Sequence, residues 1–97
     1  MDIDRIKAME EALNKTAAAV KETDALLDRM EELRGKMTAL SKYYGSAEWY
    51  EDREGELPEG VRAGVLSEDA AYDVITSLRD AAIRMLETGT DILKNRI

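Results

Sequence analysis

The side chains in this sequence that could carry out chemistry are carboxylates, and they gather between Ser46 and Asp73. That stretch holds nine acids and two bases, whereas the rest of the chain has equal numbers of each. Glu48, Glu51 and Glu54 are spaced by three, as in helical proteins that hold Mg²⁺ between facing helices to hydrolyse a phosphoanhydride. The second pair is poor here, because Asp69 and Asp73 are four apart, at the opposite edge of the loop, and no basic residue is placed to hold a phosphate. We therefore predict a solvated acidic face and keep a Mg²⁺-dependent nucleotide pyrophosphatase-like hydrolase as the last of three functional hypotheses.

Other reactive arrangements fail on residue type. Asp52, Glu54 and Glu56 alternate like the start of a calcium loop, but the sixth and twelfth positions from Asp52 are Leu57 and Ala63 instead of Gly and Glu. The chain has no cysteine and no histidine, so it has neither a thiolate nucleophile nor an imidazole base. We predict a protein that is not an enzyme, with no catalytic residue, no metal site and no cofactor.

All five aromatic residues lie in the same middle third, from Tyr43 to Tyr72. Trp49 and Tyr50 are adjacent, so on a helical turn their side chains point about 100° apart. We expect one ring to pack over the helix ends and the other to stay exposed as an anchor for a partner, since Trp and Tyr are frequent at interface hot spots. The predicted partner-binding residues are Trp49, Tyr50, Glu51, Asp52, Glu54 and Glu56.

A second set of residues in this region is predicted to be structural. Pro58, with Gly60 and Gly64, marks a loop. The aromatics before that loop, and Val61, Val65 and Leu66 within and after it, indicate that it is anchored at both ends. Arg62 is expected to pair with Asp69 or Glu68. The predicted structural residues are Tyr43, Tyr44, Pro58, Arg62, Ser67 and Asp69.

The elements that must position these residues are helices. Apolar residues recur at intervals of three and four over residues 2–44, which predicts one long amphipathic helix. A loop follows over 45–66, with Ser46 capping a short helical turn from Ala47 to Arg53. A last helix is predicted over 67–96, with Ser67 as its cap. The apolar stripe of the first helix is Ile3, Ile6, Met9, Leu13, Thr16, Val20, Leu26, Met30, Leu33, Met37, Leu40 and Tyr44, and that of the last is Ala71, Ile75, Leu78, Ala82, Met85, Gly89 and Ile92.

We predict a single all-α domain over residues 1–97, built as a long helical hairpin. Two helices can bury only one stripe each, and both carry a second apolar face that includes Leu27 and Leu86. A homodimeric four-helix bundle would cover it. The alternative is a three-helix bundle monomer in which the first helix breaks near Lys21 to Asp24, although no glycine or proline is available there for a turn.

The composition limits the classes of molecule that this protein is expected to bind. A net charge of −7 opposes direct binding to nucleic acid and to anionic membranes, because both need clustered Lys and Arg. No apolar run is long enough to span a bilayer, and the start of the chain does not resemble a signal peptide, so we predict a cytoplasmic protein. The leading hypothesis is an interaction module that presents its acidic loop to a basic protein. The alternative is an acidic decoy that inhibits a nucleic-acid-binding protein.

The middle third also carries a resemblance. The strings Tyr43-Tyr44-Gly45-Ser46, Glu48-Trp49, Leu57-Pro58 and Arg62-Ala63-Gly64-Val65-Leu66-Ser67-Glu68-Asp69 are similar to a small bacterial family, domain of unknown function 4298. The flanking helices match that family in pattern alone. The resemblance implies a bacterial or phage cytosolic protein of about this length, and it implies no activity.

Overall fold

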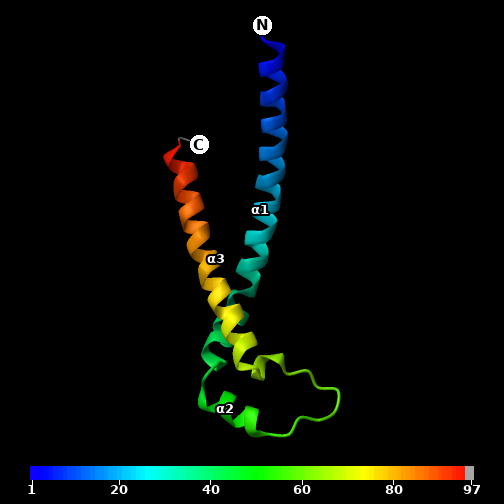
Figure 1. Cartoon of the computed structure of the whole chain (residues 1–97), viewed down its shortest axis with the longest axis vertical. Helices are drawn as coiled ribbons and strands as arrows, with labels where there is room; N and C mark the ends of the chain where they lie inside the picture. The colour runs from blue at the N-terminus through cyan, green and yellow to red at the C-terminus, as the bar shows by residue number, and fades with distance from the viewer. Residues whose placement is uncertain (96–97) are drawn as a thin grey trace. The chain divides into compact units, whose positions relative to one another are not determined.

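The fold is all-helical, as the sequence predicts. A computed structural model describes residues 1–95, and within them regular structure consists of helices without a strand. The elements are α1 (Ile3–Tyr43), α2 (Ala47–Glu54), the 3₁₀ turn η1 (Gly64–Leu66) and α3 (Glu68–Lys94), in that order along the chain (Figure 1). Among these residues, no helix has a hydrophobic stretch sufficient to cross a membrane.

Helix α1 begins at a side-chain cap and runs without interruption. The backbone N–H of Arg5 donates to the Asp2 carboxylate at 3.0 Å, which satisfies one of the free donors of the first turn. The break near Lys21 to Asp24, on which the three-helix alternative depends, is absent. Instead of capping a new helix, Thr23 donates its hydroxyl to the Ala19 carbonyl one turn earlier, at 2.7 Å. The expectation of a continuous helix over 2–44 is confirmed to within one residue at each end.

The chain divides into two compact units, each considered by itself. The first, Met1–Thr38, contains only the greater part of α1, and none of its side chains is buried. Its large apolar residues from Ile3 to Leu27 are all at least 40% exposed, whereas Met30, Leu33 and Met37 are partly buried; the exposed residues are Ile3, Ile6, Met9, Leu13, Val20, Leu26 and Leu27. The second unit starts at Ala39 and contains the end of α1 and every later element. Whether the two units form the single domain expected over 1–97 stays a prediction.

Within the second unit, helix α1 ends at a glycine turn. Gly45 has φ +77°, a left-handed conformation that glycine adopts without a steric penalty, and it follows the last turn of α1. Ser46 then caps α2, its hydroxyl accepting from the Trp49 N–H at 3.2 Å. The short helix expected over Ala47 to Arg53 is confirmed and extends one residue further, to Glu54.

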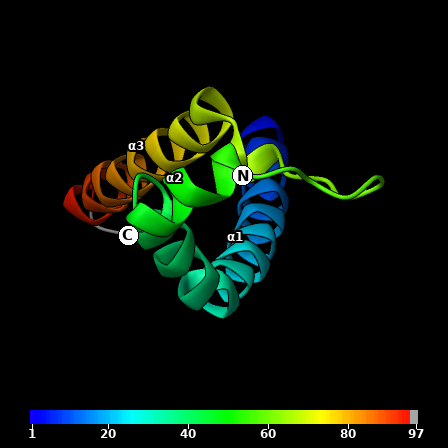
Figure 2. The ribbon, with the colours of Figure 1, turned by 90° about the horizontal axis from the view of Figure 1, so that it is seen from below.

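The connection from α2 to α3 is a loop that closes on a 3₁₀ turn. Pro58 opens a turn in which the Val61 N–H donates to the Pro58 carbonyl at 3.3 Å, and Gly60 takes φ +86°. The loop projects from the helices of this unit (Figure 2), whereas η1 lies against both α2 and α3.

Helix α3 has the side-chain cap that the sequence predicts. The Ser67 hydroxyl accepts from the Ala70 N–H at 3.4 Å, and Glu68 and Asp69 occupy the first turn, where the helix dipole favours negative charge. The helix ends at Lys94, and the predicted end at residue 96 lies outside the described residues.

Candidate functional site

The core of the second unit is one indole ring. Trp49 is 1% exposed, and within residues 1–95 the other buried apolar residue is Ala71, in the first turn of α3. The Trp49 Nε1–H donates to the Val65 carbonyl at 3.0 Å, so α2 is tied to η1 across 16 residues of chain. This bond confirms that the end of the loop at Val65 is anchored.

Three side chains surround the indole. The rings of Tyr44 and Tyr50 meet it edge-on, at centroid distances of 5.0 and 4.9 Å. The Arg53 guanidinium lies over its face, 4.6 Å from the ring centroid. Of the adjacent aromatics, Trp49 is therefore the packed ring, while Tyr50 remains 55% exposed. This burial removes Trp49 from the predicted partner-binding set, because its ring does not face the solvent.

Tyr43 and Asp52 form the second link within this unit. The Tyr43 hydroxyl, at the end of α1, donates to Asp52 Oδ2 on α2. This hydrogen bond is the main cause that raises the pKa of Tyr43 to about 12, with desolvation and the charges of Asp52 and Glu48 adding to it. Burial raises the pKa of Tyr44 as well, helped by the charge of Glu68. Tyr43 and Tyr44 thus both contact α2, and Asp52, predicted to contact a partner, also links the end of α1 to α2.

The remaining acids of the middle third face the solvent. Glu51, Glu54, Glu56 and Glu59 are exposed, and none of them forms an ion pair within residues 1–95. Residues 1–95 contain no cluster of three or more acidic side chains able to hold a metal ion. The segment from Tyr50 to Glu59, called the acidic segment below, carries five acids and one base.

The prediction for Arg62 is wrong. Its side chain is exposed, and within residues 1–95 it forms no ion pair with Glu68 or Asp69. The reason lies in the chain around it: Arg62 sits in the projecting loop, whereas both acids belong to the first turn of α3, beyond η1. Asp69 acts at the helix terminus, and Arg53, which sequence reasoning left unassigned, is the cation that packs against the core.

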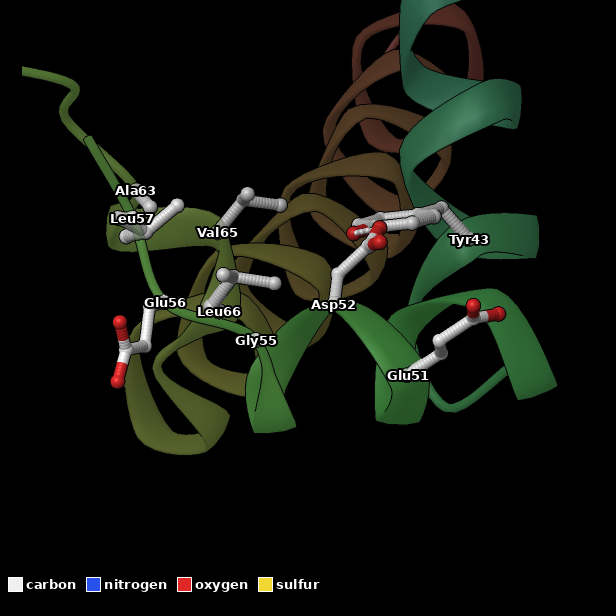
Figure 3. Close-up of a pocket in the computed structure, with 9 residues that line it drawn as sticks. All are labelled: Tyr43, Glu51, Asp52, Gly55, Glu56, Leu57, Ala63, Val65 and Leu66. Carbon is white, nitrogen blue, oxygen red and sulfur yellow. Dashed lines mark hydrogen bonds between the residues drawn. The ribbon is translucent and has the colours of Figure 1, made fainter.

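A hollow of about 520 Å³ lies beside this core (Figure 3). Sequence reasoning missed it, because its wall combines residues from α1, α2, the loop and η1. The one local sign of an apolar wall in the sequence was the pair Leu57 and Val65, which lie before and after the Pro58 turn. The lining residues are Tyr43, Glu51, Asp52, Gly55, Glu56, Leu57, Ala63, Val65 and Leu66.

A second hollow, of about 450 Å³, lies against α3. It is lined by Tyr44 together with Tyr72, Ile75, Thr76, Arg79, Asp80 and Ile83. Further along the helix, Leu86 and Leu93 are 73% and 72% exposed. The second apolar face expected from the sequence is therefore uncovered along α3.

Comparison with known proteins identifies a family for this chain. Neither the curated proteins nor the solved structures contain a significant relative. A family described as "Domain of unknown function (DUF4298)" matches residues 6–88, which include most of α1, all of α2 and η1, and most of α3. The match covers the strings around Tyr43 and Ser67 as well as both long helices, so the chain belongs to this family.

Proposed function

We propose that this chain is a non-enzymatic protein-interaction module of the cytosol, which binds a basic stretch of another protein through the acidic segment Tyr50–Glu59. The observation that carries the proposal is the contrast between the two sides of α2. One side is fixed by Trp49, and the other exposes carboxylates that pair with no base in residues 1–95. Unpaired exposed carboxylates attract a basic surface over about 8 Å at physiological salt.

The acidic segment also offers a contact that charge alone does not provide. Tyr50 is 55% exposed while its edge rests on the indole of Trp49, so the ring is held in place and still reaches the solvent. A fixed aromatic ring loses little conformational entropy on binding, which is why Tyr is enriched at interface hot spots. We assign Tyr50 as the anchor and the four exposed glutamates as the charged surface around it.

We further propose that the module is a homodimer. In the first unit the large apolar residues from Ile3 to Leu27 are exposed, and α3 exposes Leu86 and Leu93. Isolated helices are marginal in water, and most helical stability in proteins comes from packing of the apolar face. A four-helix bundle formed by two copies would cover these exposed residues. Light scattering during size exclusion measures the mass directly, and a mass of 10.9 kDa, that of one chain, would refute the dimer.

The binding proposal is tested with a matched pair of variants. In the loop variant, Glu51, Glu54, Glu56 and Glu59 become Gln, and Asp52 is kept because it holds Tyr43. In the control, four exposed acids of α1 are neutralised: Glu10, Glu22, Asp24 and Glu31. The probe is a flexible ten-residue peptide of alternating Arg and Gly.

We expect the loop variant to bind the probe about tenfold more weakly, since each exposed ion pair contributes roughly 0.2–1 kcal/mol. The control should bind like the unmodified chain. Equal weakening of both variants, or no binding by the unmodified chain, would refute the proposal. If a basic nucleic-acid-binding protein is used as the ligand and DNA displaces this chain from it, the chain occupies the DNA-binding surface and is a decoy.

A further inference from the structure

The hollow beside Trp49 has two walls of different chemistry. On one side stand Leu57, Ala63, Val65 and Leu66, and on the other stand the ring of Tyr43 and the carboxylate of Asp52 (Figure 3). Leu57 is 51% exposed and Val65 39% exposed, so the apolar wall is open to a ligand. The Glu51 and Glu56 side chains point outward at opposite edges of the hollow (Figure 3).

The polar atoms offered by side chains in this hollow can only accept hydrogen bonds. The single side-chain hydroxyl, that of Tyr43, already donates to Asp52 Oδ2, which leaves Oδ1 as a free acceptor. No lysine or arginine lines the hollow. A ligand must therefore bring both the positive charge and the donors, together with an apolar stem for the opposite wall.

We propose that this hollow receives an arginine side chain from a basic segment of a partner protein. The inference rests on the proposed function and identifies the residue type that the acidic segment recognises. The guanidinium would donate to Asp52 Oδ1, the carboxylates of Glu51 and Glu56 would add negative charge at the edges, and the aliphatic stem would pack on Leu57 and Val65. Lysine fits less well, because its ammonium is a compact, strongly hydrated charge, whereas a guanidinium is planar, more weakly hydrated and offers several donors.

The rigidity of the walls supports this assignment. Val65 is held through its carbonyl by the Trp49 Nε1–H, and Asp52 is held by Tyr43, so neither needs to be ordered on binding. The volume of about 520 Å³ lies within the ordinary range of ligand pockets and exceeds that of one side chain. Neighbouring backbone of the partner would fill the rest.

Two matched pairs of variants separate the hollow from a general acidic surface. Leu57→Ser removes the apolar wall without changing the charge, and its control is Val61→Ser, since Val61 is 52% exposed in the same loop and lines no part of the hollow. Glu56→Gln removes a carboxylate at the edge, and its control is Glu59→Gln, three residues further along the loop and outside the hollow.

The probe is an acetylated, amidated seven-residue peptide of Gly and Ser with one central Arg, compared with the same peptide carrying Lys or the uncharged analogue citrulline. Binding is followed by NMR through the indole N–H signal of Trp49, which is a single resolved reporter because the chain has one tryptophan. Its hydrogen-bond acceptor belongs to the wall of the hollow. Free argininamide in a separate titration distinguishes a small-molecule source from a peptide.

We expect the Arg peptide to bind at least about threefold more tightly than the Lys peptide, and the citrulline peptide not to bind. Leu57→Ser and Glu56→Gln should each weaken binding about fivefold, while the two controls change it less than about twofold. Argininamide binding as tightly as the peptide would refute the protein partner as the source.

If both members of each pair weaken binding equally, the acidic surface binds without the hollow, and this inference fails while the proposed function stands. If the Arg–Gly probe of the proposed function also fails to bind, the proposed function itself fails.

Discussion

Replacing Trp49 with Ala tests the central statement about the second unit, that one buried indole holds α2, η1 and the loop together. The substitution removes a ring that is 1% exposed, its hydrogen bond to Val65 and its contacts with Tyr44, Tyr50 and Arg53. Truncation of a buried Trp costs about 3–5 kcal/mol. A unit running from Ala39 to the end of the chain, roughly 59 residues, has on the order of 3–9 kcal/mol of stability in total. We therefore expect Trp49→Ala to remove at least about a third of the stability of the second unit.

A milder change keeps the test informative if that variant does not fold. Trp49→Phe retains a buried aromatic ring but loses the Nε1–H donor and leaves the Val65 carbonyl without it, which costs about 1–2 kcal/mol. Tyr72→Ala is the control, since Tyr72 is 58% exposed and a surface substitution changes stability by about 0.5 kcal/mol or less.

The assay is urea denaturation followed by far-ultraviolet circular dichroism, with the three variants compared at one protein concentration. The expected order of unfolding free energies is the unmodified chain and Tyr72→Ala first, then Trp49→Phe, then Trp49→Ala. A loss of less than about 1 kcal/mol for Trp49→Ala would refute the reasoning, because it would mean that the indole is not the packing centre of the unit.

Three further outcomes are expected. Ser46→Ala should cost about 1 kcal/mol by removing the α2 cap, while Ser77→Ala, an exposed serine inside α3, should change stability little. Tyrosinate absorbance should show Tyr43 ionising near pH 12, and Asp52→Asn should return it toward 10.0. Because the folded chain binds that proton more tightly, its contribution to stability is present below about pH 10 and is lost as the pH rises through about 12. Leu13→Ser, in the exposed stripe of α1, should shift the mass measured by light scattering from that of a dimer toward that of one chain, and an unchanged dimer mass would place the interface elsewhere.

The features that the sequence predicted well are those set by neighbouring residues. The 3.6-residue period predicted both long helices, and Ser46 and Ser67 were identified as caps because a serine hydroxyl reaches the N–H three residues ahead in its own chain. Family membership was also predictable, because the strings around Gly45 and Ser67 are continuous in sequence.

The choice between Trp49 and Tyr50 depended on tertiary structure. Adjacent residues on a helix point in different directions, so the sequence showed that one ring would pack and one would not, without showing which. The Trp49 indole N–H donates to the Val65 carbonyl, which lies 16 residues further on, and this contact could not be predicted from the local sequence. The error for Arg62 has the same origin: Arg62 is close to Glu68 and Asp69 in sequence, but within residues 1–95 it forms no ion pair with either.

The sequence by itself thus determined the helices, their caps, the acidic character of the middle third and the family. Only the tertiary structure decided that Trp49 is buried and that Tyr43 binds Asp52. It also decided that a hollow lies between this Tyr43–Asp52 pair and Leu57. The physical reason is range: periodicity and capping act within one or two turns, whereas the hollow exists because contacts across nine and sixteen residues bring four segments of the chain together.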